Sequence, residues 1–218
     1  MMTKRNVICF CMALLALLQA YAADRLYVNN LCIKPGQTTT VTVQMLNELD
    51  YTAFQTDIRL PEGLSVVMND GELGFSLSSR ATSGHQISSL LRDDGTIRVI
   101  AYTFDVKPFA GTSGALFSFQ VTAGEGFEDT STITCCNSLF TTVDGDEVAL
   151  PDVSCLVING TLGDVNRDGT INIADINMVV NIILGANVSD QIMTLADVNC
   201  DGAVTISDIN LLINMILS

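Results

Sequence analysis

The residues best suited to chemistry in this 218-residue chain lie in a repeat near the C-terminus. The segment GDVNRDGTINIADINMVVNIIL (163–184) aligns without gaps onto ADVNCDGAVTISDINLLINMIL (196–217), and 12 of the 22 positions are identical. Each copy opens with D-x-N-x-D-G and has a further Asp at the twelfth position of the loop. Oxygen donors at alternate positions of a tightly curled loop converge on one point, which is what a calcium ion with its six to eight oxygen ligands requires.

Each position of the repeated loop has a predicted role. Side chains at positions 1, 3 and 5 converge, Gly at position 6 permits the sharp turn, and the carbonyl at position 7 adds an oxygen. Position 9 ligates directly or through water, and Asp at position 12 closes the loop as a bidentate ligand. The candidate ligands of two calcium ions are Asp164, Asn166, Asp168, Thr170, Asn172 and Asp175, and in the second loop Asp197, Asn199, Asp201, Ala203, Thr205 and Asp208.

The alternative interpretation of the repeat is a pair of turns with helix caps, since Asp, Asn and Gly favour turns in any case. Two copies in register argue against it. Residues 163–218 carry seven acidic side chains and one arginine, and six of those acids are proposed ligands. Three carboxylates in each loop would repel one another without a counter-ion, and magnesium prefers to keep its waters. A segment this short is marginal without a metal, so we expect it to be unfolded, or nearly so, in chelator.

The order of elements around the loops differs from that of an EF-hand. Helix patterns follow the loops, at about 173–184 and 206–217, whereas VSCLVINGTLG (153–163) predicts a strand and a turn before the first loop. Asp also replaces the usual Glu at position 12. This loop-then-helix repeat resembles the type I dockerin family over nearly all of 163–217. The resemblance implies a non-catalytic module that binds cohesin domains and assembles secreted polysaccharide-degrading complexes in bacteria.

The resemblance also implies a partner-binding face. In that family, partner choice depends on loop positions 10 and 11 and on the helix that follows. These positions are Ile173, Ala174, Val180 and Asn181 in the first repeat, and Ile206, Ser207, Ile213 and Asn214 in the second. Many dockerins carry Ser-Thr pairs and a Lys or Arg there, so this more apolar chain should not fit their partners. A helix that is apolar nearly all round either has a partner or packs on its neighbours, and both interpretations stay open here.

Residues 24–160 show the pattern of a β domain. Short β-rich stretches at 38–46, 52–60, 96–104, 115–123 and 131–140 alternate with Gly- and Pro-containing turns. Alternation of apolar and polar residues indicates half-buried strands, and many short strands predict a sandwich or jelly roll. KPGQTTTVTVQM (34–45), YTAFQTDIRLPEGLSV (51–66) and GTSGALFSFQVTA (111–123) resemble the cohesin-like and carbohydrate-binding-module-like sandwich superfamily. The expected fold is therefore mainly β, with a β-sandwich at 24–160 followed directly by a small α module at 163–218.

The first 23 residues predict an export signal. Lys4 and Arg5 precede an apolar run at 7–18, and Ala20-Tyr21-Ala22 is typical of a cleavage site. We expect cleavage near Ala22 or Ala23 and a secreted protein, extracellular or periplasmic. The apolar run is too short to span a bilayer, and no later segment is long enough, so the mature chain is expected to have no membrane span. A formal charge of −14 argues against nucleic acid as a partner.

Five of the seven cysteines lie beyond the predicted cleavage site. Export to an oxidising compartment permits disulfides. Cys32 and Cys155 fall in the first and last predicted strands, which are candidates for neighbours in a sheet, so a Cys32–Cys155 bond is one possibility. Spacing alone does not fix the connectivity.

The composition disfavours most enzymes. There is no Trp and a single His, His85, which excludes a His-rich zinc site and a Trp-lined sugar platform. We expect Arg80 and His85 to flank a polar surface loop, and VDGDEV (143–148) to be a hairpin turn rather than a carboxylate pair for glycoside cleavage. Seven aromatic residues are expected in the core rather than in a sugar-binding row: Tyr51, Phe54, Tyr102, Phe104, Phe109, Phe117 and Phe119.

The function predicted from the sequence is that of a non-catalytic secreted adaptor. Its dockerin-like module would bind a cohesin-type domain, either on another protein or on the sandwich of an identical chain, which would join copies head to tail. In an alternative, the sandwich binds a polysaccharide or glycoprotein and the C-terminal module anchors it. In a third, the repeat only caps an adhesin-like domain.

Overall fold

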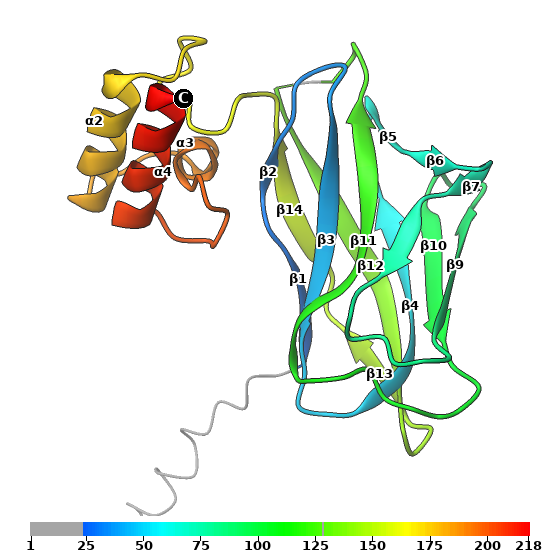
Figure 1. The fold of residues 1–218 in the computed structure, drawn as a ribbon. Coiled ribbons are helices and arrows are strands. Elements are labelled where there is room, and N and C mark those ends of the chain that lie inside the picture. The colour runs from blue at the N-terminus through cyan, green and yellow to red at the C-terminus, as the bar shows by residue number, and fades with distance from the viewer. Residues whose placement is uncertain (1–23, 128) are drawn as a thin grey trace, which may run out of the picture.

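The computed structural model describes residues 24–127 and 129–218, and the predicted export signal at 1–23 lies outside the described residues. Two β-sheets face each other, and three helices lie to one side of them, beside the edge at β1 and β2 (Figure 1). The helices are α2 (Ile173–Ile183), α3 (Asp190–Ala196) and α4 (Ile206–Leu217). None of the described helices is long and apolar enough to cross a membrane, the longest having 12 residues.

The two layers of the sandwich are built almost entirely from antiparallel pairs. The first layer has the order β1 (Arg25–Val28), β3 (Thr38–Leu46), β11 (Ser113–Ala123) and β5 (Leu64–Val66), with β8 (Phe75–Leu77) also on β11. The second has the order β2 (Leu31–Cys32), β14 (Val153–Ile158), β12 (Thr130–Thr142), β4 (Tyr51–Arg59), β10 (Ile97–Tyr102) and β9 (Gln86–Leu91), with β13 (Glu147–Leu150) on β12. A small separate hairpin pairs β6 (Met68–Asn69) with β7 (Glu72–Leu73).

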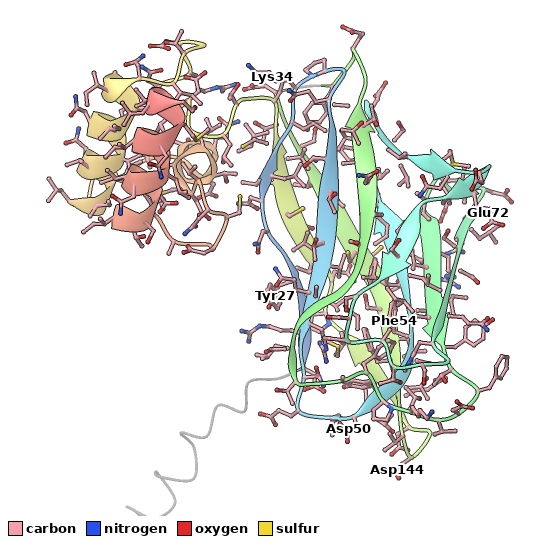
Figure 2. All side chains as sticks on the ribbon, viewed as in Figure 1. Tyr27, Lys34, Asp50, Phe54, Glu72 and Asp144 are labelled. Carbon is pink, nitrogen blue, oxygen red and sulfur yellow. The ribbon has the colours of Figure 1, made fainter. Side chains whose placement is uncertain are left out.

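The core between the layers follows from the alternation in the sequence. Along β3, the residues Val41, Val43 and Met45 are buried, while the residues between them are partly exposed. Phe54 lies between the two layers, whereas Glu72, Asp50 and Asp144 lie at the periphery (Figure 2). The Phe54 ring stacks on two further buried rings of the core, those of Phe117 at 5.3 Å and Phe140 at 5.3 Å between centroids.

All five predicted strands of the sandwich are present, with ends shifted by at most a few residues, and the predicted helices match α2 and α4. Five of the seven aromatic residues expected in the core are buried, but Tyr102 is only half-buried and Phe104 is 81% exposed. Phe104 follows the end of β10, where the chain has already left the sheet. The helix α3 was not predicted from the sequence.

Two further predictions from the sequence are wrong. Arg80 is not at the surface: its guanidinium is buried and donates to Asn47 Oδ1 at 2.7 Å and to the carbonyls of Ala110 and Gly111. The Cys32–Cys155 bond is absent, and both thiols are free. Although β2 and β14 are neighbours, their parallel register places Ile158 beside Cys32, three residues from Cys155 and thus about 10 Å along the strand.

The outer face of the second sheet contains a buried charge. The side chain of Asp57 on β4 is fully buried and receives Arg98 Nε at 2.7 Å and Nη2 at 2.9 Å, a bidentate pair. Arg92 Nη1 donates to the same carboxylate at 3.0 Å, and Asn137 Nδ2 at 3.1 Å. The hydrogen bond from Arg98 is the main cause that lowers the pKa of Asp57, and it outweighs the opposing effect of burial. This one carboxylate thus links β4 to β10, to β12 and to the segment that follows β9.

We expect Asp57→Ala to destabilise the folded chain by about 3 kcal/mol in urea unfolding at neutral pH, because two arginines lose a buried partner. The pKa of Asp57 lies below its unfolded value of about 3.9, so its contribution is present above that pH and is lost as the pH falls toward the lowered pKa. The difference between wild type and variant should therefore shrink below about pH 4.

The matched control is Asp105→Ala, which removes an exposed pair with Lys107 at 3.4 Å. Exposed pairs contribute about 0–1 kcal/mol, so the control should change little. Equal effects of the two substitutions, or a difference that does not depend on pH, would contradict the role given to Asp57.

Candidate calcium loops and docking face

The first repeated loop is organised around two carboxylates. Asp175, the first-turn acid of α2, is fully buried, and its Oδ1 accepts hydrogen bonds from the backbone N–H groups of Val165 at 2.8 Å and Asn166 at 3.0 Å. Its Oδ2 accepts from the backbone N–H of Asn172 at 2.9 Å. Asp164 Oδ2 accepts from the N–H of Gly169 at 3.0 Å, whereas Asp164 Oδ1 is buried without a hydrogen-bond partner.

The second loop repeats this arrangement. Asp208 is fully buried and accepts from the N–H groups of Asn199 at 3.2 Å and Thr205 at 2.8 Å. Asp197 Oδ2 accepts from the N–H of Gly202 at 2.8 Å. Gly202 has φ of +90°, and the equivalent glycine of the first loop has +91°, a conformation that a side chain with Cβ disfavours. The identical positions in the sequence therefore produce a similar local geometry, with the difference that Asp197 Oδ1 accepts from the N–H of Asp201 at 3.1 Å.

The acids at position 5 of the loops are more exposed and hydrogen-bond to neighbours in the loop. Asn166 Nδ2 donates to Asp168 Oδ2 at 2.8 Å, and Asn199 Nδ2 donates to Asp201 Oδ2 at 2.7 Å. Hydrogen bonds, first that from the Thr170 hydroxyl, lower the pKa of Asp168. Burial raises the pKa of Asp197 despite two backbone hydrogen bonds. In the first loop, the first-position acid is the one with a carboxylate oxygen that has no hydrogen-bond partner, Asp164 Oδ1.

The donor set of each loop fits a calcium ion. Within the described parts of the chain, no three His, Cys, Asp or Glu side chains form a cluster able to hold a metal. The loops, however, combine three carboxylates with asparagine, threonine and carbonyl oxygens, which are ligands that calcium prefers. The buried, unpartnered Asp164 Oδ1 is a charged acceptor that needs a cation or a donor. The individual ligand assignments stay predictions.

The same carboxylates that organise the loops also start the helices. Asn172 caps α2 by accepting from the N–H of Ala174 at 2.8 Å, and Asp175 completes a capping box. Thr205 and Asp208 do the same for α4. The two helices pack on each other around a small core of Val165, Val179, Ile182, Ala196 and Leu212. In each repeat, one acid thus stabilises both the conformation of the loop and the start of the helix, so the two structures depend on each other.

The helix faces that do not enter this core remain open. Of the predicted partner-binding residues, Ile173 and Ile206 are 66% and 68% exposed, and Val180 and Ile213 are 36% and 38% exposed. The polar members of the set, Asn181, Ser207 and Asn214, are exposed as well, and only Ala174 is half-buried. Packing of the helices on each other thus accounts for one side of each helix, and equivalent positions of both repeats present an apolar face to solvent.

Exposed apolar side chains are concentrated in this part of the molecule. Among the described residues, eleven of the nineteen exposed large hydrophobic side chains lie in α2, α3, α4 or directly after α2. In Figure 1, α3 lies on the side of the helices that faces the sandwich, and α2 lies away from it. An exposed apolar surface of this kind is typical of a site that binds another protein.

His85, the single histidine, is engaged with its own loop. Its Nδ1 lies 3.1 Å from the Thr82 hydroxyl, and its ring packs on Phe109 at 4.2 Å between centroids. VDGDEV (143–148) contains the predicted turn between β12 and β13, and its last two residues begin β13. The residues through which the helices contact the sandwich could not be identified from the sequence, although Arg167, the only basic residue in 163–218, was a signal for such a contact.

We expect Asp175→Ala to unfold α2 and the first loop even with calcium present, because three backbone N–H groups lose their acceptor at a cost of about 1–3 kcal/mol each. Helical circular dichroism should fall, while the sandwich keeps its own cooperative transition. Asp175→Asn, which retains one acceptor oxygen, should be intermediate. The exposed mid-helix change Asn177→Ala is the control, and an Asp175→Ala variant as helical as this control would contradict the dual role of Asp175.

Comparison with known proteins agrees with this geometry. The model of the Dockerin type I domain family matches residues 162–217, about a quarter of the chain. No curated protein sequence matches the chain. The sandwich is similar to a non-cellulosomal cohesin from the archaeon Archaeoglobus fulgidus, with a TM-score of 0.54 and 14% identity over 66% of this chain and 96% of that one.

Two bacterial cohesins give the same result. A cohesin module of a family 33 glycoside hydrolase from Clostridium perfringens has a TM-score of 0.52 and 10% identity, covering 63% of this chain and 96% of that one. The sixth cohesin of scaffoldin B from Acetivibrio cellulolyticus, solved in complex with a mutant Cel5 dockerin, has a TM-score of 0.51 and 13% identity, covering 63% and 99%. Residues 162–217 are therefore a type I dockerin domain, and they follow a β-sandwich with the cohesin fold.

Proposed function

We propose that this protein is a non-catalytic secreted adaptor whose dockerin binds a cohesin-type domain in a calcium-dependent way. The observation that carries the proposal is the exposed apolar face at equivalent positions of α2 and α4, beside two loops with a calcium-type donor set. The sandwich of the same chain has the cohesin fold. Export at the predicted signal would place the protein where polysaccharide-degrading assemblies operate.

Two calcium ions would be held by the two loops, one in each. Asp164, Asp168 and Asp175 in the first loop, together with the equivalent acids of the second, would provide the charge, and the asparagine, threonine and carbonyl oxygens would complete the coordination. A bound cation would neutralise the buried Asp164 carboxylate and hold the loop that positions the start of α2.

We expect calorimetric titration of the chain from Asp24 onward to show two calcium ions bound, and each of Asp168→Ala and Asp201→Ala to remove one of them. These acids are exposed and cap no helix, so the change affects the site rather than the helix start. At free calcium about 100 times the dissociation constant, each site stabilises the dockerin by about 2.7 kcal/mol. Chelator should therefore abolish most of the helical signal.

Asp190→Ala, in the first turn of α3 and outside both loops, is the matched control and should keep both ions. Unchanged stoichiometry in both loop variants, or full helicity in chelator, would refute calcium-dependent folding of the dockerin.

The docking face, which includes Ile173 and Val180 in the first repeat and Ile206 and Ile213 in the second, determines what surface a cohesin must present to bind it. Both repeats offer two branched apolar side chains where other dockerins carry hydroxyl and basic groups, and no basic side chain lies on α2 or α4. A fitting cohesin must present a complementary apolar patch, since an ion pair with this face is impossible. The two faces are equivalent by the repeat, so either helix offers similar contacts.

We expect the double variant Val180→Glu/Ile213→Glu to lose capture of cohesin-containing proteins from a secreted fraction by at least about tenfold, because two charges enter an apolar contact. Calcium uptake and helicity should be unchanged. Leu211→Glu is the matched control: Leu211 is 37% exposed on the same helix, as Ile213 is, but lies about 160° around the axis from it. Equal loss in control and double variant, or no loss in either, would reject this face.

The source of the cohesin has two candidates. One is a separate secreted protein, and the other is the sandwich of a second copy of this chain, which has the same fold. Sedimentation of the wild-type chain with and without calcium distinguishes them, since calcium-dependent oligomers sensitive to the Val180→Glu/Ile213→Glu change arise only in the second case. Glycan binding by the sandwich has less support, because most of its aromatic side chains are stacked in the core.

A further inference from the structure

The dockerin contacts the sandwich through side chains at the seam between them. Asn29 Nδ2 donates to the carbonyl of Cys200 at 2.6 Å, and Asn30 Nδ2 donates to the Thr194 hydroxyl at 3.0 Å. The second calcium loop and α3 are thus attached to the β1–β2 connection, far from them in the sequence. Elsewhere on the seam, Gln191 of α3 hydrogen-bonds to Thr130 of β12.

The residue at position 4 of each loop makes a seam contact. Arg167 in the first loop pairs with Asp129 and also donates to the carbonyl of Asn159 at 3.3 Å. Cys200 is its counterpart in the second loop. Both take a left-handed backbone conformation, with φ of +60° and +56°, which non-glycine residues seldom adopt without a reason in the surrounding structure. The loops therefore place corresponding residues toward the sandwich and leave the helix faces away from it.

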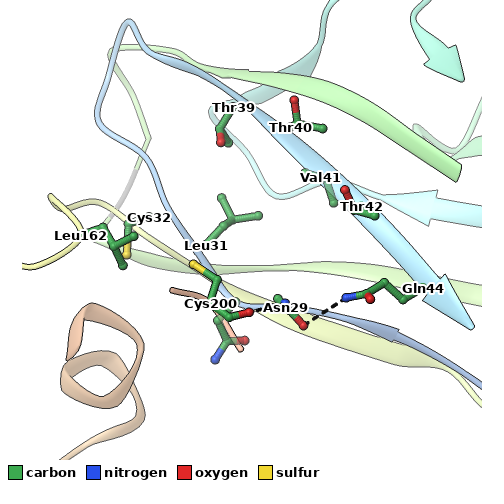
Figure 3. Close-up of a pocket in the computed structure, with 11 residues that line it drawn as sticks. Asn29, Leu31, Cys32, Thr39, Thr40, Val41, Thr42, Gln44, Leu162 and Cys200 are labelled. Carbon is green, nitrogen blue, oxygen red and sulfur yellow. Dashed lines mark hydrogen bonds between the residues drawn. The ribbon is translucent and has the colours of Figure 1, made fainter. Parts of the chain in front are cut away.

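Cys200 shares a cavity at this seam with a cysteine of the sandwich. Cys200 and Cys32 line the same cavity of about 250 Å³, together with Asn29, Leu31 and Leu162 (Figure 3). Cys32 comes from β2 of the sandwich, and Cys200 from the dockerin. They are the two partly exposed members of the five described cysteines, the other three being buried.

The other cysteines are less suited to pair with either thiol. Cys155 is three residues out of register with Cys32 and belongs to the sandwich core. Cys135 is also in that core, diagonal to Cys155, because Ile133 is the residue directly opposite Cys155. Cys136 lies on β12 beside Asp57. Of the described cysteines, only Cys32 and Cys200 share an open cavity at the seam.

We propose that Cys32 and Cys200 form an intramolecular disulfide that fastens the second calcium loop to the sandwich. With a low-molecular-weight disulfide such as oxidised glutathione, the Cys200 thiolate attacks one glutathione sulfur and releases one reduced glutathione. The Cys32 thiolate then attacks Cys200 Sγ, forms the Sγ–Sγ bond and releases the second. Both protons leave on the two glutathione thiols, and two protein thiols are oxidised as one glutathione disulfide is reduced. The bond would fix the dockerin on the sandwich with its helix face open.

The test is oxidation of the chain from Asp24 onward with oxidised glutathione in calcium-containing buffer, followed by non-reducing digestion and peptide mass spectrometry. The expected product is a monomer in which Cys32 and Cys200 peptides are linked, and in which titratable thiols under denaturing conditions fall from five to three. Cys32→Ser and Cys200→Ser should each abolish the link. Cys155→Ser, the matched control, should leave it intact.

Folding of every variant is checked by circular dichroism and by calcium titration, so that loss of the link is not confused with loss of structure. Exhaustive oxidation of folded protein that leaves Cys200 free would overturn the proposal. So would a Cys135–Cys155 link in its place, or a disulfide between two copies. The test is also distinguishable from that of the proposed function, because the bond needs no cohesin partner.

Discussion

One acidic residue closes each loop, Asp175 in the first repeat and Asp208 in the second. It stabilises both the loop and the helix that follows, and neither of these forms without the other. One oxygen accepts from backbone N–H groups at the beginning of the loop, and the other accepts from the residue that caps the helix. A buried carboxylate is costly unless its hydrogen bonds are complete, so loop and helix form together. The remaining charge in each loop creates the need for a cation.

This coupling explains why a small helical module can leave so much apolar surface open. Its core contains few fully buried apolar side chains, such as Val179 and Leu212, and could not by itself offset the conformational entropy of the segment. If ion binding supplies the missing free energy, the outer helix faces are not needed for folding. They are then available for recognition, which is where Ile173, Ile206 and their neighbours lie.

The sequence was most informative where a short-range pattern decides the structure. Alternation along 38–46 fixed β3, and the repeat with its capping acids fixed α2 and α4. It was least informative where distant segments meet. The register that separates Cys32 from Cys155 depends on how β2 enters the sheet, and the burial of Arg80 depends on carbonyls thirty residues away. Neither leaves a local trace.

The site shows the same division. The loop residues could be predicted because oxygen donors recur at fixed spacing. The helix α3 was not predicted because its seven residues carry little periodicity, and the residues of the seam could not be identified because their partners lie far away in the sequence. The seam follows a rule that becomes visible only in three dimensions. In both loops, position 4 faces the sandwich, and positions 10 and 11 begin the helices that face solvent. Because the dockerin contacts the sandwich through its loops, its helix faces stay free for a partner. The contact within the chain and the contact with another protein use different surfaces, so both can exist at once.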